Sequence, residues 1–474
     1  MKPRTAFLLA AVVLLACACS PAQVQLSDTP AAHQLSGWLA AFNSGDRTTY
    51  LTFLQKNYPA RAGEIDQAMG FRAQTGGFDL KKASECDATK CSAIVQERNS
   101  EQFARIAVEV DPAEPHAIKS FELRAVPRPA EFPIARMTEG EALKAFRAYL
   151  DQAAAADRFS GAVLVAKDGK PVFTAAYGMA DREKKIPNQL GTQFRIGSMN
   201  KMFTATAVLQ LVQAGKINLT DPLGKYLTDY PNKDVASKVT IHHLLTHTGG
   251  TGDFFGPEFD KHRLELRALQ DYVKLYGERG LAFDPGSRWE YSNYGFLLLG
   301  LIVEKASGQN YYDYVREHIF KPAGMNSTDS LPEDQAVPGR SVGYTKMGGA
   351  KEWHPNVDTL PYRGTSAGGG YSTVEDLLAF ANALENHKLL DAKHVELLTT
   401  GKVATPMGPK YSYGFEEGIS PDSVRCVGHG GGAPGMNGDF KICPQSGYVI
   451  AVLANLDPMA AGHAADFITA RLPK

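Results

Sequence analysis

Residues 194–201 are Phe-Arg-Ile-Gly-Ser-Met-Asn-Lys, and an apolar stretch, residues 202–211, follows them directly. The apolar stretch predicts a buried helix that ends near Gly215. Ser198 would then stand at the N-terminus of this helix, with Lys201 one turn later on the same face. The helix dipole and burial favour an anionic oxygen on Ser198 and a neutral amine on Lys201. The pair can therefore act as nucleophile and proton acceptor, although a helix cap followed by a solvated lysine gives the same tetrapeptide.

Two later segments carry complementary chemistry. Residues 289–295, Trp-Glu-Tyr-Ser-Asn-Tyr-Gly, precede an apolar helix, so Tyr291 and Asn293 can present a phenol and an amide from one short turn. The phenol can relay a proton between nucleophile and leaving group, and the amide can hold the lysine and the substrate. Residues 428–432, Gly-His-Gly-Gly-Gly, end a predicted strand. Glycines there allow close approach of a substrate, and backbone N–H groups can point at a developing oxyanion.

In this order, the three segments resemble the serine β-lactamase and penicillin-binding-protein superfamily. The resemblance is closer to its class C β-lactamase-related branch, which includes D-alanyl-D-alanine carboxypeptidases, D-aminopeptidases and family VIII carboxylesterases. It runs from about residue 139 to residue 474 and includes three further stretches: residues 241–250 (Ile-His-His-Leu-Leu-Thr-His-Thr-Gly-Gly), Pro285-Gly286, and residues 367–373 (Ala-Gly-Gly-Gly-Tyr-Ser-Thr).

The resemblance implies a role for each motif residue. Ser198 would be the acylated nucleophile, Lys201 its partner, Tyr291 the general base or proton relay, and Asn293 the orienting amide. The backbone N–H groups of Ser198 and Gly432 would form the oxyanion hole.

His429, Gly430 and Gly431 would replace the family's Lys-Thr-Gly strand and bind or orient the substrate. The histidine is a departure from the lysine that helps true β-lactamases bind a carboxylate. Histidine is largely neutral above its unperturbed pKa of about 6.5 and attracts anions less. We therefore expect peptidase, amidase or esterase activity rather than dedicated antibiotic hydrolysis.

The ends of residues 133–474 are predicted to share one sheet. Residues 161–177 predict a hairpin that turns at Asp168-Gly169. Three more strands are predicted at residues 425–428, 438–443 and 448–455, a closing helix at 463–472, and helices between the two ends. This order predicts an α/β (α+β) fold, with a central antiparallel sheet flanked by helices and an inserted helical lobe. The resemblance implies the same β-lactamase/transpeptidase-like architecture.

Residues 23–132 predict a separate, small α+β domain. Apolar residues recur at helical spacing in residues 38–42 and 50–54, and they alternate as in strands in residues 106–110 and 121–126. The segment looks somewhat like the nuclear-transport-factor-like cone fold, and it shows no catalytic cluster. Residues 127–133, Pro-Arg-Pro-Ala-Glu-Phe-Pro, cannot continue a helix or a central strand and mark the boundary to residues 133–474.

Residues 1–22 predict a secretory signal. Lys2 and Arg4 precede an apolar run that is too short to span a bilayer. Residues 14–17, Leu-Leu-Ala-Cys, resemble a bacterial lipobox, whereas residues 16–18, Ala-Cys-Ala, fit ordinary cleavage, so lipidation at Cys17 or Cys19 stays open. We expect an exported protein, either periplasmic or lipid-anchored to a bacterial membrane.

Four cysteines remain after the signal: Cys86, Cys91, Cys426 and Cys443. The first two could close a hairpin loop, and the last two lie on predicted strands. In an oxidising compartment we expect the disulfides Cys86–Cys91 and Cys426–Cys443, with buried free thiols as the alternative.

Composition limits the partners. The 474 residues include 50 Lys and Arg against 51 Asp and Glu, a formal net charge of −1, with 44% hydrophobic and 21% charged residues. These values suit a soluble globular protein and exclude collagen-like, disordered and polytopic membrane classes. No long basic block indicates nucleic acid binding. We expect a small-molecule or peptide substrate and no membrane contact beyond the N-terminal anchor, while the oligomeric state stays open.

Three alternatives remain: a dedicated β-lactamase, a non-catalytic penicillin-binding or sensor module, and an esterase of the α/β-hydrolase type. The last would use Ser366 in residues 364–368, Gly-Thr-Ser-Ala-Gly, with His429 or His463 as its partner, but the flanking strand and helix of that motif are missing. No metal or organic cofactor is expected. His243 and His247 lack the glutamate of a zinc-binding H-E-x-x-H helix.

Overall fold

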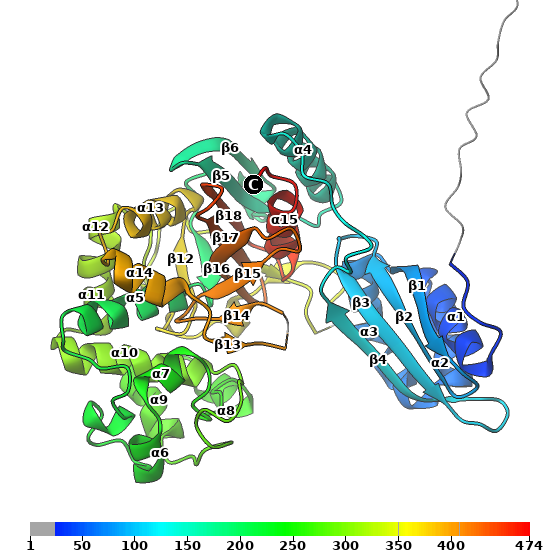
Figure 1. Cartoon of the computed structure of the whole chain (residues 1–474), viewed down its shortest axis with the longest axis horizontal. Helices are drawn as coiled ribbons and strands as arrows, with labels where there is room; N and C mark the ends of the chain where they lie inside the picture. The colour runs from blue at the N-terminus through cyan, green and yellow to red at the C-terminus, as the bar shows by residue number, and fades with distance from the viewer. Residues whose placement is uncertain (1–23, 349, 407) are drawn as a thin grey trace, which may run out of the picture.

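Two groups of helices and strands, joined by residues 127–138, make up the chain (Figure 1). The computed structural model describes residues 24–474 except 349 and 407, so the predicted signal segment with Cys17 and Cys19 lies outside the described residues. Within the described ranges, no helix combines the length and apolar character needed to cross a bilayer. The boundary expected after residue 132 falls in the joining stretch and stays a prediction.

The first group packs three helices on one face of a four-stranded antiparallel sheet of order β1-β2-β3-β4. The core of this group forms around Trp38, which stacks on Phe42 at 4.7 Å between ring centroids and donates a hydrogen bond to the Tyr50 hydroxyl. A disulfide joins Cys86 to Cys91 across the first hairpin. The elements are α1 (Pro30–Asn43), α2 (Arg47–Asn57), α3 (Ile65–Thr75), β1 (Phe78–Cys86), β2 (Lys90–Glu97), β3 (Phe103–Val110) and β4 (Ile118–Val126).

The second group is built on an antiparallel sheet that draws strands from both ends of residues 133–474. Among the described residues, eight strands pair in the order β13-β14-β15-β16-β17-β18-β5-β6. The predicted hairpin is β5 and β6, and it turns at Asp168 and Gly169, whose φ angles are 49° and 76°. The strands are β5 (Gly161–Lys167), β6 (Lys170–Tyr177), β13 (Val403–Ala404), β14 (Lys410–Tyr411), β15 (Glu416–Ile419), β16 (Arg425–Ala433), β17 (Met436–Cys443) and β18 (Tyr448–Ala454).

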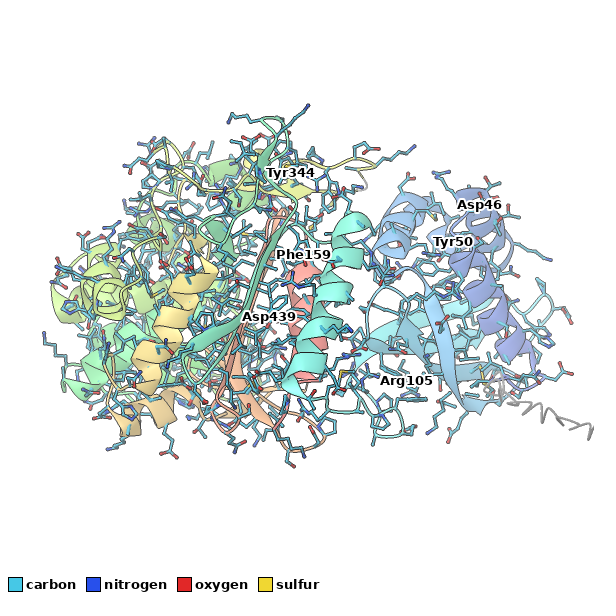
Figure 2. The ribbon with its side chains drawn as sticks, turned by 90° about the horizontal axis from the view of Figure 1, so that it is seen from above. Asp46, Tyr50, Arg105, Phe159, Tyr344 and Asp439 are labelled. Atoms are coloured by element: carbon cyan, nitrogen blue, oxygen red, sulfur yellow. A yellow bond between two sulfur atoms is a disulfide. The ribbon has the colours of Figure 1, made fainter. Side chains whose placement is uncertain are left out.

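Alternate residues of β5 face two separate cores. Leu164 packs toward the helical lobe, whereas Val163 and Val165 pack against α4 (Glu139–Ala155) and α15 (Ala460–Thr469). The predicted capping box starts α4, because Thr138 and Glu141 bond each other's backbone N–H groups. Figure 2 shows Asp439 of β17 within the larger group, with Asp46 and Tyr50 on the helical side of the smaller one. The predicted central sheet with helices on both faces is confirmed.

The helical lobe and its connections fill the middle of the chain, as expected (Figure 1). Its helices are α5 (Asn200–Gln213), α6 (Lys233–Lys238), α7 (Ile241–Leu245), α8 (Pro257–His262), α9 (Leu269–Tyr276), α10 (Asn293–Ser307), α11 (Tyr311–Val315), α12 (Lys321–Ala323), α13 (Val374–Glu385) and α14 (Ala392–Thr399). Short strand pairs connect them: β7 (Met179–Asp181) with β8 (Ile186–Pro187), β10 (Tyr344–Thr345) with β11 (His354–Pro355), and β12 (Gly370–Ser372) with β9 (Phe194–Gly197).

Strand β16 extends further than the sequence predicted. It does not end at Gly428 but continues through the glycine segment, because β17 supplies partners as far as Ala433. On its other side, β15 pairs only up to Gly428. Residues 429–433 therefore form a strand with one free edge. A disulfide between Cys426 and Cys443 joins β16 to β17 near the start of β16, before the residues with the free edge.

Candidate active site

Ser198 and Lys201 lie where β9 ends and α5 begins. The Lys201 backbone N–H donates to the Ser198 carbonyl at 2.9 Å, which forms the first turn and brings both side chains to one face. Helix α5 is almost entirely buried, and the Lys201 side chain is 0% exposed. The alternative interpretation, a helix cap followed by a solvated lysine, is therefore wrong.

The Lys201 amine has three close oxygen neighbours. Its Nζ atom lies 2.7 Å from Asn293 Oδ1, 2.6 Å from the Ala367 carbonyl oxygen and 3.2 Å from Ser198 Oγ. Burial lowers the pKa of Lys201 to about 7, and the charge of Asp253 opposes this shift. A neutral amine has two hydrogens, which Asn293 and Ala367 accept, so its lone pair is left to face Ser198 Oγ. Lys201 can thus take the serine proton.

The turn before α10 supplies the phenol and the amide. Ser292 caps the helix by accepting from the Gly295 N–H at 2.9 Å, and this places Asn293 in the first turn beside Lys201. Tyr291 shares a hydrogen bond with the Ser198 side chain, and Lys201 Nζ lies 4.7 Å from the centre of its ring. Burial raises the pKa of Tyr291 far above its usual range, so the phenol keeps its proton at rest. It is suited to relay a proton rather than to act as the resting base.

The free edge of β16 runs past the nucleophile. A Cβ atom added at Gly431 would lie 1.9 Å from the Ile196 carbonyl oxygen and 3.1 Å from the Ser198 nitrogen, so only glycine permits this approach. One at Gly197 would lie 2.8 Å from the Gly432 nitrogen. The backbone nitrogens of Ser198 and Gly432 are therefore neighbours at the site, as an oxyanion hole requires.

His429 is buried and hydrogen-bonded within the protein, and its expected role in substrate binding stays a prediction. It is 4% exposed, its Nε2 atom lies 3.0 Å from the Tyr411 hydroxyl, and its Nδ1 atom bonds the Gly430 carbonyl. Burial, with a smaller effect of the Lys201 charge, lowers the pKa of His429 to about 3. Both ring nitrogens are occupied and the ring is neutral. In this arrangement it holds the strand and offers a substrate neither a free donor nor a positive charge.

A family model described as Beta-lactamase matches residues 146–472. The chain belongs to the β-lactamase family. A penicillin-binding protein from Bacillus halodurans shares 32% sequence identity and a TM-score of 0.61 with it, covering 70% of this chain and 99% of that structure. The D-amino acid amidase from Ochrobactrum anthropi SV3 shares 26% identity and a TM-score of 0.57, covering 70% of this chain and 96% of the amidase.

Curated relatives span the same range of chemistry. Esterase EstB of Burkholderia gladioli is 31% identical over 313 residues, which cover 58% of this chain and 79% of the esterase. The chain also spans 64% of the length of a Bacillus subtilis penicillin-binding protein that is 31% identical over 299 residues. This β-lactamase-family chain is thus related to penicillin-binding proteins, an esterase and amidases.

Three further residues contact this β-lactamase-family site, and the sequence did not predict this placement for any of them. Asp253 Oδ2 accepts from Asn293 Nδ2 at 2.8 Å. His247, fully buried, accepts from the Ser292 N–H with its Nδ1 at 3.1 Å, and its ring lies 4.2 Å from that of Tyr291. Tyr411 holds His429. A signal existed for two of them, because His247 lies in the quoted residues 241–250 and Asp253 follows three residues later.

Two other motifs do not form the sites that their residues could indicate. Ser366 is 0% exposed, and a Cβ atom added at Gly300 would lie 2.4 Å from its hydroxyl, so it is packed against α10 instead of lying on an open elbow. Its buried hydroxyl has no hydrogen-bond partner, and so none with His429 or His463, among the residues that the structure describes, so the esterase alternative that uses Ser366 is wrong for this β-lactamase-family fold. His243 caps α7 by accepting from the Thr240 N–H. Across the residues that the structure describes, no three His, Cys, Asp or Glu side chains gather as metal ligands.

Proposed function

We propose that this protein is an exported serine hydrolase that cleaves an ester or amide bond through an acyl-enzyme on Ser198. The observation that carries the proposal is the state of Lys201. Its amine is fully buried, has a pKa lowered to about 7, and is held by two acceptors so that its lone pair faces Ser198 Oγ. A serine with such a base beside it is an activated nucleophile.

In the proposed acylation step, Ser198 Oγ attacks the substrate carbonyl and its proton passes to Lys201 Nζ. The negative charge that develops on the carbonyl oxygen is stabilised by the N–H groups of Ser198 and Gly432. The bond to the leaving group then breaks, and Tyr291 donates a proton to the departing nitrogen or oxygen. The proton on Lys201 restores that of Tyr291, so the acyl-enzyme forms with a neutral amine and a neutral phenol.

In deacylation, water takes the place of the leaving group. Lys201, neutral again, accepts a proton from the attacking water, and Ser198 recovers its proton as the acyl group leaves. The whole cycle uses side chains and backbone N–H groups of this chain. The lowered pKa of Lys201 supports acylation of Ser198, and turnover of the acyl-enzyme distinguishes an enzyme from a sensor that stays acylated.

The charge of the site supports a proposal for the substrate class. The dedicated β-lactamase alternative needs a group that attracts the antibiotic's carboxylate, and the position of the family's lysine holds the neutral, fully bonded His429. We therefore propose esters, amides or peptides without a carboxylate next to the scissile bond. The esterase and the amidase among the relatives support this class.

Export is part of the proposal. The signal-like residues 1–22 support it, and so do the disulfides Cys86–Cys91 and Cys426–Cys443, since disulfides persist in oxidising compartments. The protein would be periplasmic or anchored through a lipid on Cys17 or Cys19. Mass spectrometry of the mature N-terminus distinguishes the two, because a diacylglyceryl group adds hundreds of daltons.

The test is covalent labelling of the purified protein with a fluorophosphonate probe. The native protein and Ser366→Ala should both be labelled, and Ser198→Ala should not. Labelling that survives in Ser198→Ala would overturn the assignment of the nucleophile. Absence of labelling in the native protein, with no hydrolysis of p-nitrophenyl esters or amino acid anilides, would favour a binding module.

A further inference from the structure

Asp253 lies directly behind the amide that holds the catalytic lysine. Its two carboxylate oxygens have separate partners: Oδ2 accepts from Asn293 Nδ2 at 2.8 Å, and Oδ1 accepts from the Phe254 backbone N–H at 2.7 Å. Arg279 donates to the Asp253 carbonyl oxygen at 2.6 Å. Asp253 is only partly exposed. It is therefore a fixed negative charge aimed at Asn293.

The orientation of the Asn293 amide decides where the lysine lone pair points. With Oδ1 toward Lys201, the amide accepts one amine hydrogen and the Ala367 carbonyl accepts the other. If the amide were turned by 180°, Nδ2 would donate to Lys201 and occupy the lone pair that faces Ser198. A carboxylate on the far side prevents this, because it accepts hydrogen bonds only and so holds Nδ2 on its own side.

We propose that Asp253 is a positioning residue that fixes the Asn293 amide so that Lys201 keeps its lone pair for Ser198. The proposal rests on the function proposed above, since it concerns the same nucleophile and base. Asp253 acts through Asn293 and does not touch the reacting atoms. The short chain of hydrogen bonds from Asp253 through Asn293 and Lys201 to Ser198 joins three segments that are distant in sequence.

The charge of Asp253 has a second consequence. The charged or titratable groups around Lys201 are Tyr291 from the turn before α10, His247 from the end of α7, His429 from β16, and Asp253. Burial keeps the phenol and both imidazoles neutral near pH 7, since it raises the pKa of Tyr291 and lowers those of His247 and His429. Asp253 is thus the group whose negative charge favours the protonated lysine. Its removal should make the lysine lose its proton at a lower pH.

The experiment measures the rate of fluorophosphonate labelling of Ser198 from pH 5 to pH 9 in Asp253→Asn. Labelling reports the activation of the nucleophile without the need for a known substrate. We expect the labelling rate at the plateau of the profile to fall about 10- to 100-fold, the usual cost of a misplaced hydrogen bond to a charged group. We also expect the acid limb of the profile, the range in which the rate falls as the pH drops, to move to lower pH. A merely structural role would lower the rate without moving the limb.

Three further variants make the test specific. Asp260→Asn removes an exposed carboxylate seven residues away and should leave both rate and limb unchanged. Asp253→Glu keeps the charge and should retain the limb at its native position while lowering the rate. In an Asn293→Ala background, Asp253→Asn should cause less than a threefold further loss, because the residue through which it acts is gone.

The results of these labelling experiments test the role of Asp253 separately from the proposed function. A full additional loss in the Asn293→Ala background would overturn the positioning role, and an unmoved acid limb in Asp253→Asn would overturn the effect of the Asp253 charge on Lys201. If the native protein is labelled but hydrolyses no ester or amide, the proposed function fails while the labelling profiles still decide the role of Asp253. If the native protein is not labelled at all, both proposals fail together.

Discussion

The protonation of Lys201 makes a quantitative prediction about pH. Burial lowers the lysine pKa from 10.5 to about 7, and only the neutral amine can accept the Ser198 proton. The neutral fraction is then about 0.09 at pH 6 and about 0.9 at pH 8, so kcat/KM should rise about tenfold between these values. A lysine with the usual pKa would be only about 0.3% neutral at pH 8, and activity would keep rising beyond pH 10.

The assay is hydrolysis of p-nitrophenyl butyrate from pH 5 to pH 9, corrected for spontaneous hydrolysis. The profile of kcat/KM reports groups in the free enzyme. Activity should fall as the pH drops, because protonation of Lys201 removes the lone pair that accepts the Ser198 proton. His429 cannot produce this limb, since its pKa is lowered to about 3.

One other buried group requires a control. Burial raises the pKa of Asp439, which lies opposite Gly430 in the register of β16 and β17. Asp439→Asn should keep the acid limb, whereas the residual activity of Lys201→Ala should lack it. A limb above pH 9 in the native protein, or one that disappears in Asp439→Asn and persists in Lys201→Ala, would refute the assignment to Lys201.

Three other predictions concern the surroundings of the site. His429→Lys should increase the acylation rate by a fluorescent penicillin at least tenfold, because it restores a cation beside the glycine segment, and an unchanged rate would contradict our explanation of the substrate class. Replacing Cys426 and Cys443 by serine opens a disulfide that spans 17 residues and should lower the free energy of unfolding by about 3 kcal/mol in urea titrations; equal midpoints would exclude this contribution. His247→Leu leaves the buried Ser292 N–H without an acceptor and should lower the free energy of unfolding in urea by about 1–3 kcal/mol. His247→Asn retains an acceptor and tolerates the positive φ of 58°, so it should recover most of this stability, and equal losses in the two variants would contradict the role of the hydrogen bond.

The elements that the sequence predicted well are those specified by local patterns. Thr138 and Glu141 form the expected capping box, and Asp168-Gly169 turns the expected hairpin, because both depend on residues within a few positions of each other. Strand β16 was predicted too short. Its glycines have a weak strand preference of their own, and its extension depends on pairing with β17, which no local pattern reveals.

The same division applies to the site. Residue types and their order indicated Ser198, Lys201, Tyr291 and Asn293, and the structure brings all four together. His429 lies on β16 as the sequence indicated, but its bond to Tyr411, a residue on another strand, could not be read from the sequence, and its part in substrate binding stays a prediction.

By itself, the sequence determined that Ser198 and Lys201 share one face of a helix, because a spacing of three residues places two side chains together wherever a helix forms. Only the tertiary structure decided that the lysine is buried and that its pKa is lowered. The free energy of an ammonium group depends on the water and dipoles around it, and these are set by α10, the Ala367 carbonyl and Asp253. These groups come from segments between 52 and 166 residues away along the chain, and their packing alone removes water from the amine and directs its lone pair to Ser198.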